Sequence, residues 1–242
     1  MSHAPWAALP AAAALLLAPA GEAAAPAVRD AYAPTARTSL IARIIRPTPA
    51  HTAADGRAPV RVRLTTEAAW ARGPVGLLVL GSRTSATGHL WLRVAVPVRP
   101  NGASAWVDRD GVQLVRTTWR VRVDVGARRL TVLRNGRVVR SSRVVIGAPG
   151  TPTPRGDFAI SELVRQPPGS VIGPWALHLT AFSKVLHSYD GGPGRIALHG
   201  RAGTLLADPL GSARSHGCVR MPSALVRWLA ARLRPGVPVD IR

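Results

Sequence analysis

The chain has 242 residues, a formal net charge of +20 and one cysteine, Cys218. A single thiol cannot close an intrachain disulfide, so a disulfide-stapled scaffold is excluded. Basic residues outnumber acidic ones by 13 to 5 over residues 28–117 and by 19 to 6 over residues 118–242, which excludes a basic tail on a neutral domain and indicates a surface that attracts polyanions.

Residues 1–25 have the features of a secretory signal peptide. An apolar run of small residues fills positions 7–20, and small-x-small cleavage sites follow it. A disordered Ala/Pro tail is the alternative. The run is shorter than the roughly 20 residues of a membrane span, no cysteine follows it for lipid attachment, and no later stretch is long enough to cross a bilayer. We therefore expect export to the cell wall or periplasmic space, with no integral span after cleavage. There, anionic wall polymers rather than nucleic acid are the available polyanions.

An Ala/Pro-rich linker is expected at residues 26–37, followed by a small β domain at 38–117. Its predicted strands, separated by Gly, Pro and Asn, are residues 60–66, 76–82, 90–96 and 103–115. Short strands at this spacing are typical of a small barrel or sandwich. Trp70, Trp91 and Trp106 are interpreted as core residues, with a patch that stacks on sugars or peptides as the alternative.

Residues 118–242 predict a second, mainly β domain with one helix. Asn135-Gly136 lies between two β-rich runs and favours a two-residue type I′ hairpin. A loop rich in Pro and Gly follows it. Apolar residues at helical spacing predict a helix over 222–234, with Pro235-Gly236 ending it. The other predicted strands are residues 119–125, 156–163, 175–182, 195–200 and 237–242.

The cysteine lies in the stretch SHGCVRM, residues 215–221. Its nucleophilic form is the thiolate, and at an unperturbed pKa near 8.5 only about 3% of a thiol is ionised at neutral pH. A neighbouring imidazole can take the proton and remain beside the thiolate as imidazolium. A histidine on an adjacent strand faces a thiol more readily than one in the same tight turn. We therefore favour His199 as the base and assign His216 to holding the turn.

Two neighbours of the cysteine fit the same chemistry. Gly217 lets the backbone turn so that amide N–H groups face the thiol and can stabilise an oxyanion. Arg220, two residues further on in an extended chain, is expected on the same side as the thiol. Its charge would lower the thiol pKa and could clamp a carboxylate. Two alternatives stay open: a cysteine that only packs in the core, or an open zinc site made by His199, His216 and Cys218.

The stretches IALHG and SHGCVRM together resemble the L,D-transpeptidase catalytic domain, the YkuD-type family. The family pattern is a His-Gly pair followed by Ser/Thr-His-Gly-Cys-x-Arg, and this sequence meets it at every position. RLTVLRNGRVV, GTPTPRGDF and GPWALHLTAF resemble the upstream parts, so the likeness covers about residues 118–242. It implies a mainly β fold: a β-sandwich-like catalytic domain with one C-terminal helix. The domain that precedes it here is β-barrel-like and resembles no family so specifically.

The resemblance implies a peptidoglycan L,D-transpeptidase that needs neither cofactor nor metal. Cys218 would form a thioester with a stem peptide and release D-Ala, and an amine of a neighbouring stem would complete a 3→3 cross-link. His199 would be the base, oriented by the carbonyl of Gly200. Two other classes stay open: an L,D-carboxypeptidase-like cysteine hydrolase of stem peptides, and a non-catalytic wall-binding protein.

The expected site therefore has two groups of residues. The catalytic group is Cys218, His199, His216 and Gly217. The substrate-binding group is Arg220, Ser215, Gly200 and Tyr189, with Tyr189 on a glycine-rich segment that would form a lid. His178 and His187 are interpreted as packed or solvated rather than as residues of the cleft.

Overall fold

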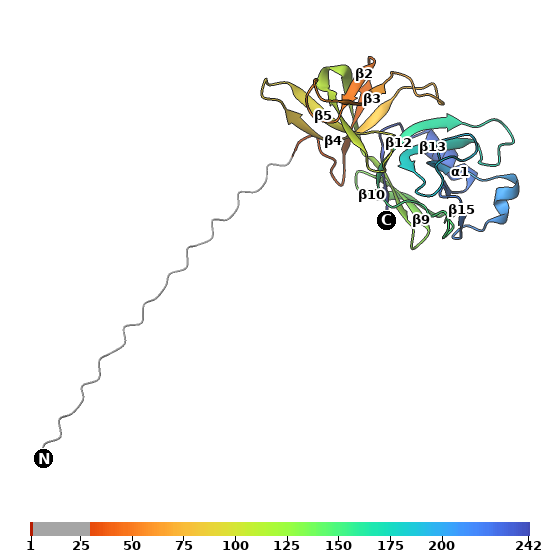
Figure 1. The fold of residues 1–242 in the computed structure, drawn as a ribbon. Helices are drawn as coiled ribbons and strands as arrows, with labels where there is room; N and C mark the ends of the chain where they lie inside the picture. Colours follow the sequence, from red (N-terminus) through yellow and green to blue (C-terminus); the bar gives the residue numbers. More distant parts are fainter. Residues whose placement is uncertain (2–29) are drawn as a thin grey trace.

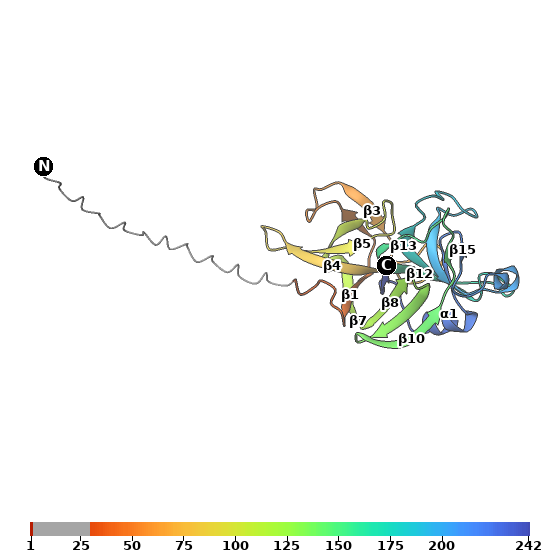
Figure 2. The same ribbon diagram turned by 90° about the horizontal axis from the view of Figure 1, so that it is seen from below.

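The computed structural model describes Met1 and residues 30–242. The predicted signal peptide, apart from Met1, and the first part of the predicted linker lie outside the described residues. Figure 1 and Figure 2 show two lobes side by side, with the C-terminus at their junction. Within the described residues, no helix is long and apolar enough to cross a membrane.

The first lobe is one seven-stranded antiparallel sheet that wraps around its own core. The strand order is β3-β2-β6-β5-β4-β1-β7. All seven strands contribute buried aliphatic residues, among them Ala42, Leu92 and Val107, and this is why the lobe is barrel-like. The strands are β1 (Ser39–Ile44), β2 (Thr48–His51), β3 (Val60–Leu64), β4 (Gly76–Thr84), β5 (Leu90–Ala95), β6 (Ser104–Asp108) and β7 (Val112–Thr117).

The second lobe is a curled eight-stranded mixed sheet, in the order β10-β9-β8-β17-β12-β13-β14-β16. The pairs β8–β17 and β14–β16 are parallel, and the other pairs are antiparallel. A two-stranded parallel sheet, β11-β15, lies beside it. The elements are β8 (Trp119–Asp124), β9 (Arg129–Arg134), β10 (Arg137–Arg143), β11 (Ile146–Gly147), β12 (Gly156–Arg165), β13 (Trp175–Phe182), β14 (Arg195–His199), β15 (Ala213–Ser215), β16 (Val219–Arg220), α1 (Ser223–Ala230) and β17 (Pro238–Ile241).

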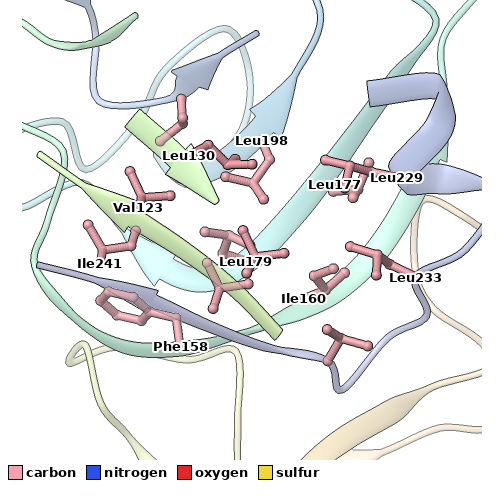
Figure 3. Packing of buried hydrophobic residues seen from close by; sticks show 14 of the residues in the cluster. Val123, Leu130, Phe158, Ile160, Leu177, Leu179, Leu198, Leu229, Leu233 and Ile241 are labelled. Atoms are coloured by element: carbon pink, nitrogen blue, oxygen red, sulfur yellow. The ribbon is translucent and has the colours of Figure 1, made fainter. Parts of the chain in front are cut away.

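One face of the second sheet curls over α1 and forms the main core. Leu229 and Leu233, both fully buried, pack near Leu177 and Ile160 of the sheet (Figure 3). At about 25 cal/mol per Å² of buried apolar surface, each such leucine contributes roughly 1.5–3 kcal/mol to folding. The helix thus fixes the inner face of β12, β13 and β14, and the opposite face of these strands is left to form the site.

The mainly β fold with one C-terminal helix is confirmed, and several local predictions need correction. Asn135 and Gly136 both have positive φ, 53° and 76°, and join β9 to β10 as a two-residue turn, as predicted. The predicted strand over 103–115 is two strands, because a short 3₁₀ turn at Arg109–Gly111 breaks it. The helix ends at Ala230 rather than at residue 234.

The tryptophans of the first lobe have different environments. Trp91 is 7% exposed and Trp106 is half-buried, whereas Trp70 is 45% exposed. The core interpretation is therefore wrong for Trp70, which lies in the loop between β3 and β4.

The two lobes are packed against each other. Leu78 and Ala95 of the first sheet form a small apolar cluster with Ala159 of the second. Arg120 of β8 donates to Asp240 of β17 at 2.8 Å and to the carbonyl of Thr35 at 3.0 Å, so it ties the segment that leads into β1 to the second lobe.

Candidate active site

Strand pairing brings the predicted cysteine and histidine together. Parallel pairing of β14 with β16 places Leu198 opposite Val219 and His199 opposite Arg220. Leu198 and Val219 are buried in the core, so the alternate residues point to the other face of the sheet. On that face His199, Cys218 and Arg220 line one cavity of about 490 Å³. A larger hollow, about 980 Å³, lies beside the loop that precedes β13 and contains neither the cysteine nor any histidine.

The Cys218 thiol is held against the backbone of β14. Its Sγ accepts a hydrogen bond from the Ala197 N–H at 3.4 Å. Burial raises the pKa of the Cys218 thiol above its ordinary value, although the Ala197 N–H and the charge of Arg220 act in the opposite direction. The resting group is therefore a thiol at neutral pH.

His199 is oriented by its own strand end. It is 5% exposed, and its Nδ1 lies 2.7 Å from the carbonyl oxygen of Gly200. A carbonyl only accepts, so Nδ1 carries the proton and Nε2 is the basic nitrogen. Burial lowers the pKa of His199 to about 4, and the charge of Arg220 also lowers it, while the backbone carbonyls of Gly200 and Ile172 oppose the shift.

The pair is thus a neutral imidazole and a neutral thiol. The sequence predicted an imidazolium beside a thiolate. Burial disfavours both charged forms, because each would lose hydration that the cavity wall does not replace. This arrangement suits transfer of the thiol proton to His199 while the sulfur attacks a carbonyl carbon, rather than before the attack.

The turn before the cysteine is held by hydroxyl groups. Ser215, 1% exposed, donates to the Cys218 carbonyl at 2.6 Å and accepts the Gly217 N–H at 3.1 Å. Thr153, from the loop rich in Pro and Gly, donates to the Gly217 carbonyl at 2.8 Å. Gly217 has φ of 115°, and a Cβ there would lie 2.9 Å from Ile196, so only glycine fits without strain.

The structure places four of the predicted site residues as follows. Ser215 and Gly200 do not line the cavity; they contact the Cys218 carbonyl and the His199 Nδ1 from behind it. The N–H of Gly217 itself donates to Ser215, so any oxyanion donor in this turn would be another amide. His216 does not hold the turn, because its exposed ring contacts Tyr189.

Arg220 lies on the cysteine side, as predicted, but it already has a partner. The side chain is 9% exposed, and its guanidinium donates to Asp208 at 2.6 Å. The Nε atom is buried and has no partner within the described part of the chain. Asp208 follows the short 3₁₀ turn after β14, and its sequence context carries no signal for this contact.

Tyr189 lies at the tip of a flap formed by residues 183–194, between β13 and β14. Its hydroxyl is 3.1 Å from His216 Nδ1, and the two rings are 5.1 Å apart. Tyr189 and Gly192 exchange two backbone hydrogen bonds of 2.9 Å around a tight turn. Tyr189 and His216 both line the cavity, so the flap covers one side of it.

Three further residues line the cavity, and sequence reasoning did not assign them to the site. His178 packs against Trp70, as predicted, and also lines the cavity, whereas His187 is exposed outside it. Arg195 and Trp70 line it too, and Glu162 pairs with Arg195 at 3.3 Å. Glu162 and Arg195 are charged residues in otherwise apolar strands, ISELVR and RIALH, and this pattern could have indicated that they belong to a site. Nothing in the sequence pointed to Trp70.

The zinc alternative does not fit the geometry. The only group of three His, Cys, Asp or Glu residues within residues 30–242 whose ligand atoms lie within 4.8 Å of one another is His89, Asp108 and Asp110. It lies in the first lobe and is partly exposed, and it does not include Cys218 or either neighbouring histidine.

Comparison with known proteins places this site in a family. The family model for the L,D-transpeptidase catalytic domain (YkuD) matches residues 118–241. The chain is 30% identical over 123 residues to the "Putative L,D-transpeptidase YkuD" of Bacillus subtilis (strain 168), and 31% identical over 124 residues to the protein of that name from Bacillus licheniformis. Each match covers 51% of this chain and 65% of the relative, so the chain spans less than two thirds of their length.

Among the solved structures that match this chain is L,D-transpeptidase 3 from Mycobacterium tuberculosis in complex with a faropenem-derived adduct. It is 13% identical, and the match covers 69% of this chain and 91% of that one, with a TM-score of 0.43. A likeness of this size adds nothing to the assignment, which rests on the family model and the sequence relatives. On that basis the chain belongs to the L,D-transpeptidase catalytic domain (YkuD) family.

Proposed function

We propose that the protein is a peptidoglycan L,D-transpeptidase that forms 3→3 cross-links through Cys218. The observation that carries the proposal is the pairing of β14 with β16, which sets a buried histidine with a basic Nε2 on the same cavity face as the single thiol of the chain. Family membership supplies the substrate class, stem peptides of the bacterial cell wall.

The reaction divides into two acyl transfers. The Sγ of Cys218 attacks the carbonyl between the diamino acid and the terminal D-Ala, and Nε2 of His199 takes the thiol proton. The C–N bond breaks, the same proton goes to the leaving amine of D-Ala, and a thioester remains. An amine of a second stem then attacks the thioester, and its proton returns to the thiol through His199. One peptide bond is broken and one is formed, so no external energy source is needed.

The extracytoplasmic setting follows from the same proposal. Stem peptides lie outside the cytoplasmic membrane, and the expected signal peptide would deliver the chain there. The excess of Arg on both halves would favour contact with anionic wall polymers. A single thiol suits an oxidising compartment, because it has no internal partner with which to form a disulfide.

The test is incubation of the purified protein with disaccharide-tetrapeptide, followed by mass analysis of the products. Transfer gives a cross-linked dimer that lacks one D-Ala. Hydrolysis gives a tripeptide monomer, which would instead identify the L,D-carboxypeptidase-like alternative. The Cys218→Ala variant should reduce either product to background while its melting temperature stays close to that of the wild type. Turnover that survives in this variant would refute the thiol assignment.

A further inference from the structure

One wall of the Cys218 cavity comes from the first lobe, outside the region that the family model covers. Trp70 lies near the tip of the loop between β3 and β4 and lines the cavity. The loop is closed on itself, because the Ala68 N–H donates to the Gly73 carbonyl at 2.8 Å and the Arg72 N–H to the Ala68 carbonyl at 3.1 Å. Trp70 is 45% exposed, so part of its surface is free for contact with a ligand.

A buried carboxylate of the second lobe fixes this loop. Glu162 on β12 is 4% exposed, and its Oε2 accepts the backbone N–H groups of Trp70 and Ala71 at 3.2 and 3.0 Å. Its Oε1 accepts a hydrogen bond from Arg195 at 3.3 Å. A buried charge that loses its partners is strongly unfavourable, so these contacts hold Trp70 in one position over the cleft face of the sheet.

The indole lies beside two nitrogen groups whose hydrogen-bonding capacity is not used. The His178 ring is 5.0 Å from the indole at 65°, and the Arg195 guanidinium lies 4.9 Å from the centre of its ring. Within the described residues, Nδ1 of His178 and Nε of Arg195 are buried and have no hydrogen-bond partner. Both side chains line the cavity together with Cys218.

We propose that Trp70, His178 and Arg195 form a subsite for the donor stem peptide, an inference that rests on the function proposed above. An indole face packs well on peptide planes and aliphatic side chains, and the guanidinium of Arg195 beside it, 14% exposed, suits peptide carbonyl or carboxylate oxygens. His178 on β13 lies opposite Ala197 of β14, whose N–H donates to Cys218 Sγ, so the His178 backbone is about one strand spacing, roughly 4.8 Å, from the strand that holds the thiol. The Trp70 ring lies a further 5.0 Å from the His178 ring, so the far side of the subsite is up to roughly 10 Å from the thiol.

That separation selects which part of the substrate the subsite holds. The leaving group is a single D-Ala residue, and one extended residue spans only about 3.5 Å. About three extended residues span 10 Å, so the acyl side of the stem is long enough to reach Trp70, whereas the single leaving residue is not. The first lobe would therefore help to select the donor stem.

The test compares Trp70→Ala with Trp70→Phe and with Trp106→Ala, a control in the same lobe that does not line the cavity. With disaccharide-tetrapeptide, Trp70→Ala should raise KM about three- to tenfold with kcat within twofold of the wild type, and Trp70→Phe should recover most of the loss. A second readout needs no turnover: the rate of Cys218 modification by a fluorescein-sized maleimide relative to iodoacetamide. Trp70→Ala should raise the ratio of the maleimide rate to the iodoacetamide rate about threefold or more, because it removes one wall of the cavity. Trp106→Ala should leave this ratio unchanged.

Two results would contradict the proposal that Trp70 belongs to a substrate subsite. In one, Trp70→Ala leaves both KM and the reagent ratio at wild-type values. In the other, it lowers the melting temperature and raises the rates of both reagents equally, which assigns Trp70 to holding the lobes together. If the wild-type protein does not turn over the tetrapeptide, the proposed function fails, and the reagent ratio still decides whether Trp70 walls the cavity.

Discussion

Burial sets the ionisation of Cys218 and His199, the two side chains to which we assign the reaction. It raises the pKa of the Cys218 thiol and lowers the pKa of His199 to about 4, so both are uncharged over the neutral range. A preformed ion pair would react with electrophiles at low pH, whereas a neutral pair would not. The ionisation state of the free enzyme can therefore be read from reagents that need no binding site.

At the scale of single residues, we predict how the rate of Cys218 alkylation by iodoacetamide depends on pH. Wild-type Cys218 should show no low-pH plateau, and its rate should rise only in the alkaline range, because the thiolate is the reactive form. The His199→Ala variant should keep nearly the same profile, yet acylation by a stem peptide should fall by about 10²–10⁴ through loss of the general base. The pH dependence of alkylation and the single-turnover acylation rate are the two measurements.

The control for this prediction is His216→Ala. Its ring is exposed and contacts Tyr189, so acylation should fall less than tenfold. Low-pH reactivity in the wild type that disappears with His199→Ala would instead demonstrate an ion pair. A larger loss in His216→Ala than in His199→Ala would reverse the two assignments.

At the scale of elements, the first lobe holds the base of the flap. Arg99 donates to the carbonyls of Ser183, Leu186 and Pro193 at 2.9, 3.3 and 3.2 Å, so it bridges both ends of the flap. The side chain of Asn101 exchanges two hydrogen bonds of 2.8 Å with the backbone of Phe182.

We expect Arg99→Ala to loosen the flap without unfolding the sheet. The contacts are partly exposed, so their loss should cost about 1–2 kcal/mol locally and raise amide hydrogen exchange in residues 183–194 about five- to thirtyfold. Arg83→Ala is the matched control, because Arg83 lies over Trp106 on the first sheet, away from the flap. Equal exchange in the two variants would show that the flap does not depend on the first lobe.

At the scale of the whole molecule, buried neutral histidines make stability depend on pH. Burial lowers the pKa of His178 to about 4, and the charge of Arg195 contributes, so His178 matches His199. In the unfolded chain a histidine titrates near 6.5. Between pH 6.5 and 4 the unfolded chain binds more protons than the folded one, so stability is present above 6.5 and falls as the pH drops toward 4.

Each of these histidines should remove about 3 kcal/mol of stability across that window, on an order-of-magnitude basis. Urea unfolding at pH 7, 6, 5 and 4 measures the loss, and His178→Phe should make the decline shallower by about half. His187→Phe, at an exposed position, should retain the full wild-type decline. Stability independent of pH across this range would contradict burial of the two neutral rings.

The sequence by itself determined the features that are local or periodic. Alternation predicted most strands, Asn135-Gly136 predicted the turn between β9 and β10, and apolar spacing predicted the helix. The short stretch around Cys218 was enough to indicate the family, because a reactive thiol, its neighbours and a His-Gly strand end are read directly from the chain. These signals depend on residues that are close in sequence, so they can be recognised without a three-dimensional structure.

Only the tertiary structure decided what surrounds the thiol. Trp70 and Glu162 are 92 positions apart, and Arg99 contacts a segment more than 80 positions away, so no periodic pattern links them. The ionisation of Cys218 and His199 was likewise misjudged, because the cost of charge depends on burial, which pairing of β14 with β16 and the covering flap create. The local motif points to the two groups proposed to react, and the packing of the two lobes sets their charge and the shape of the cleft around them.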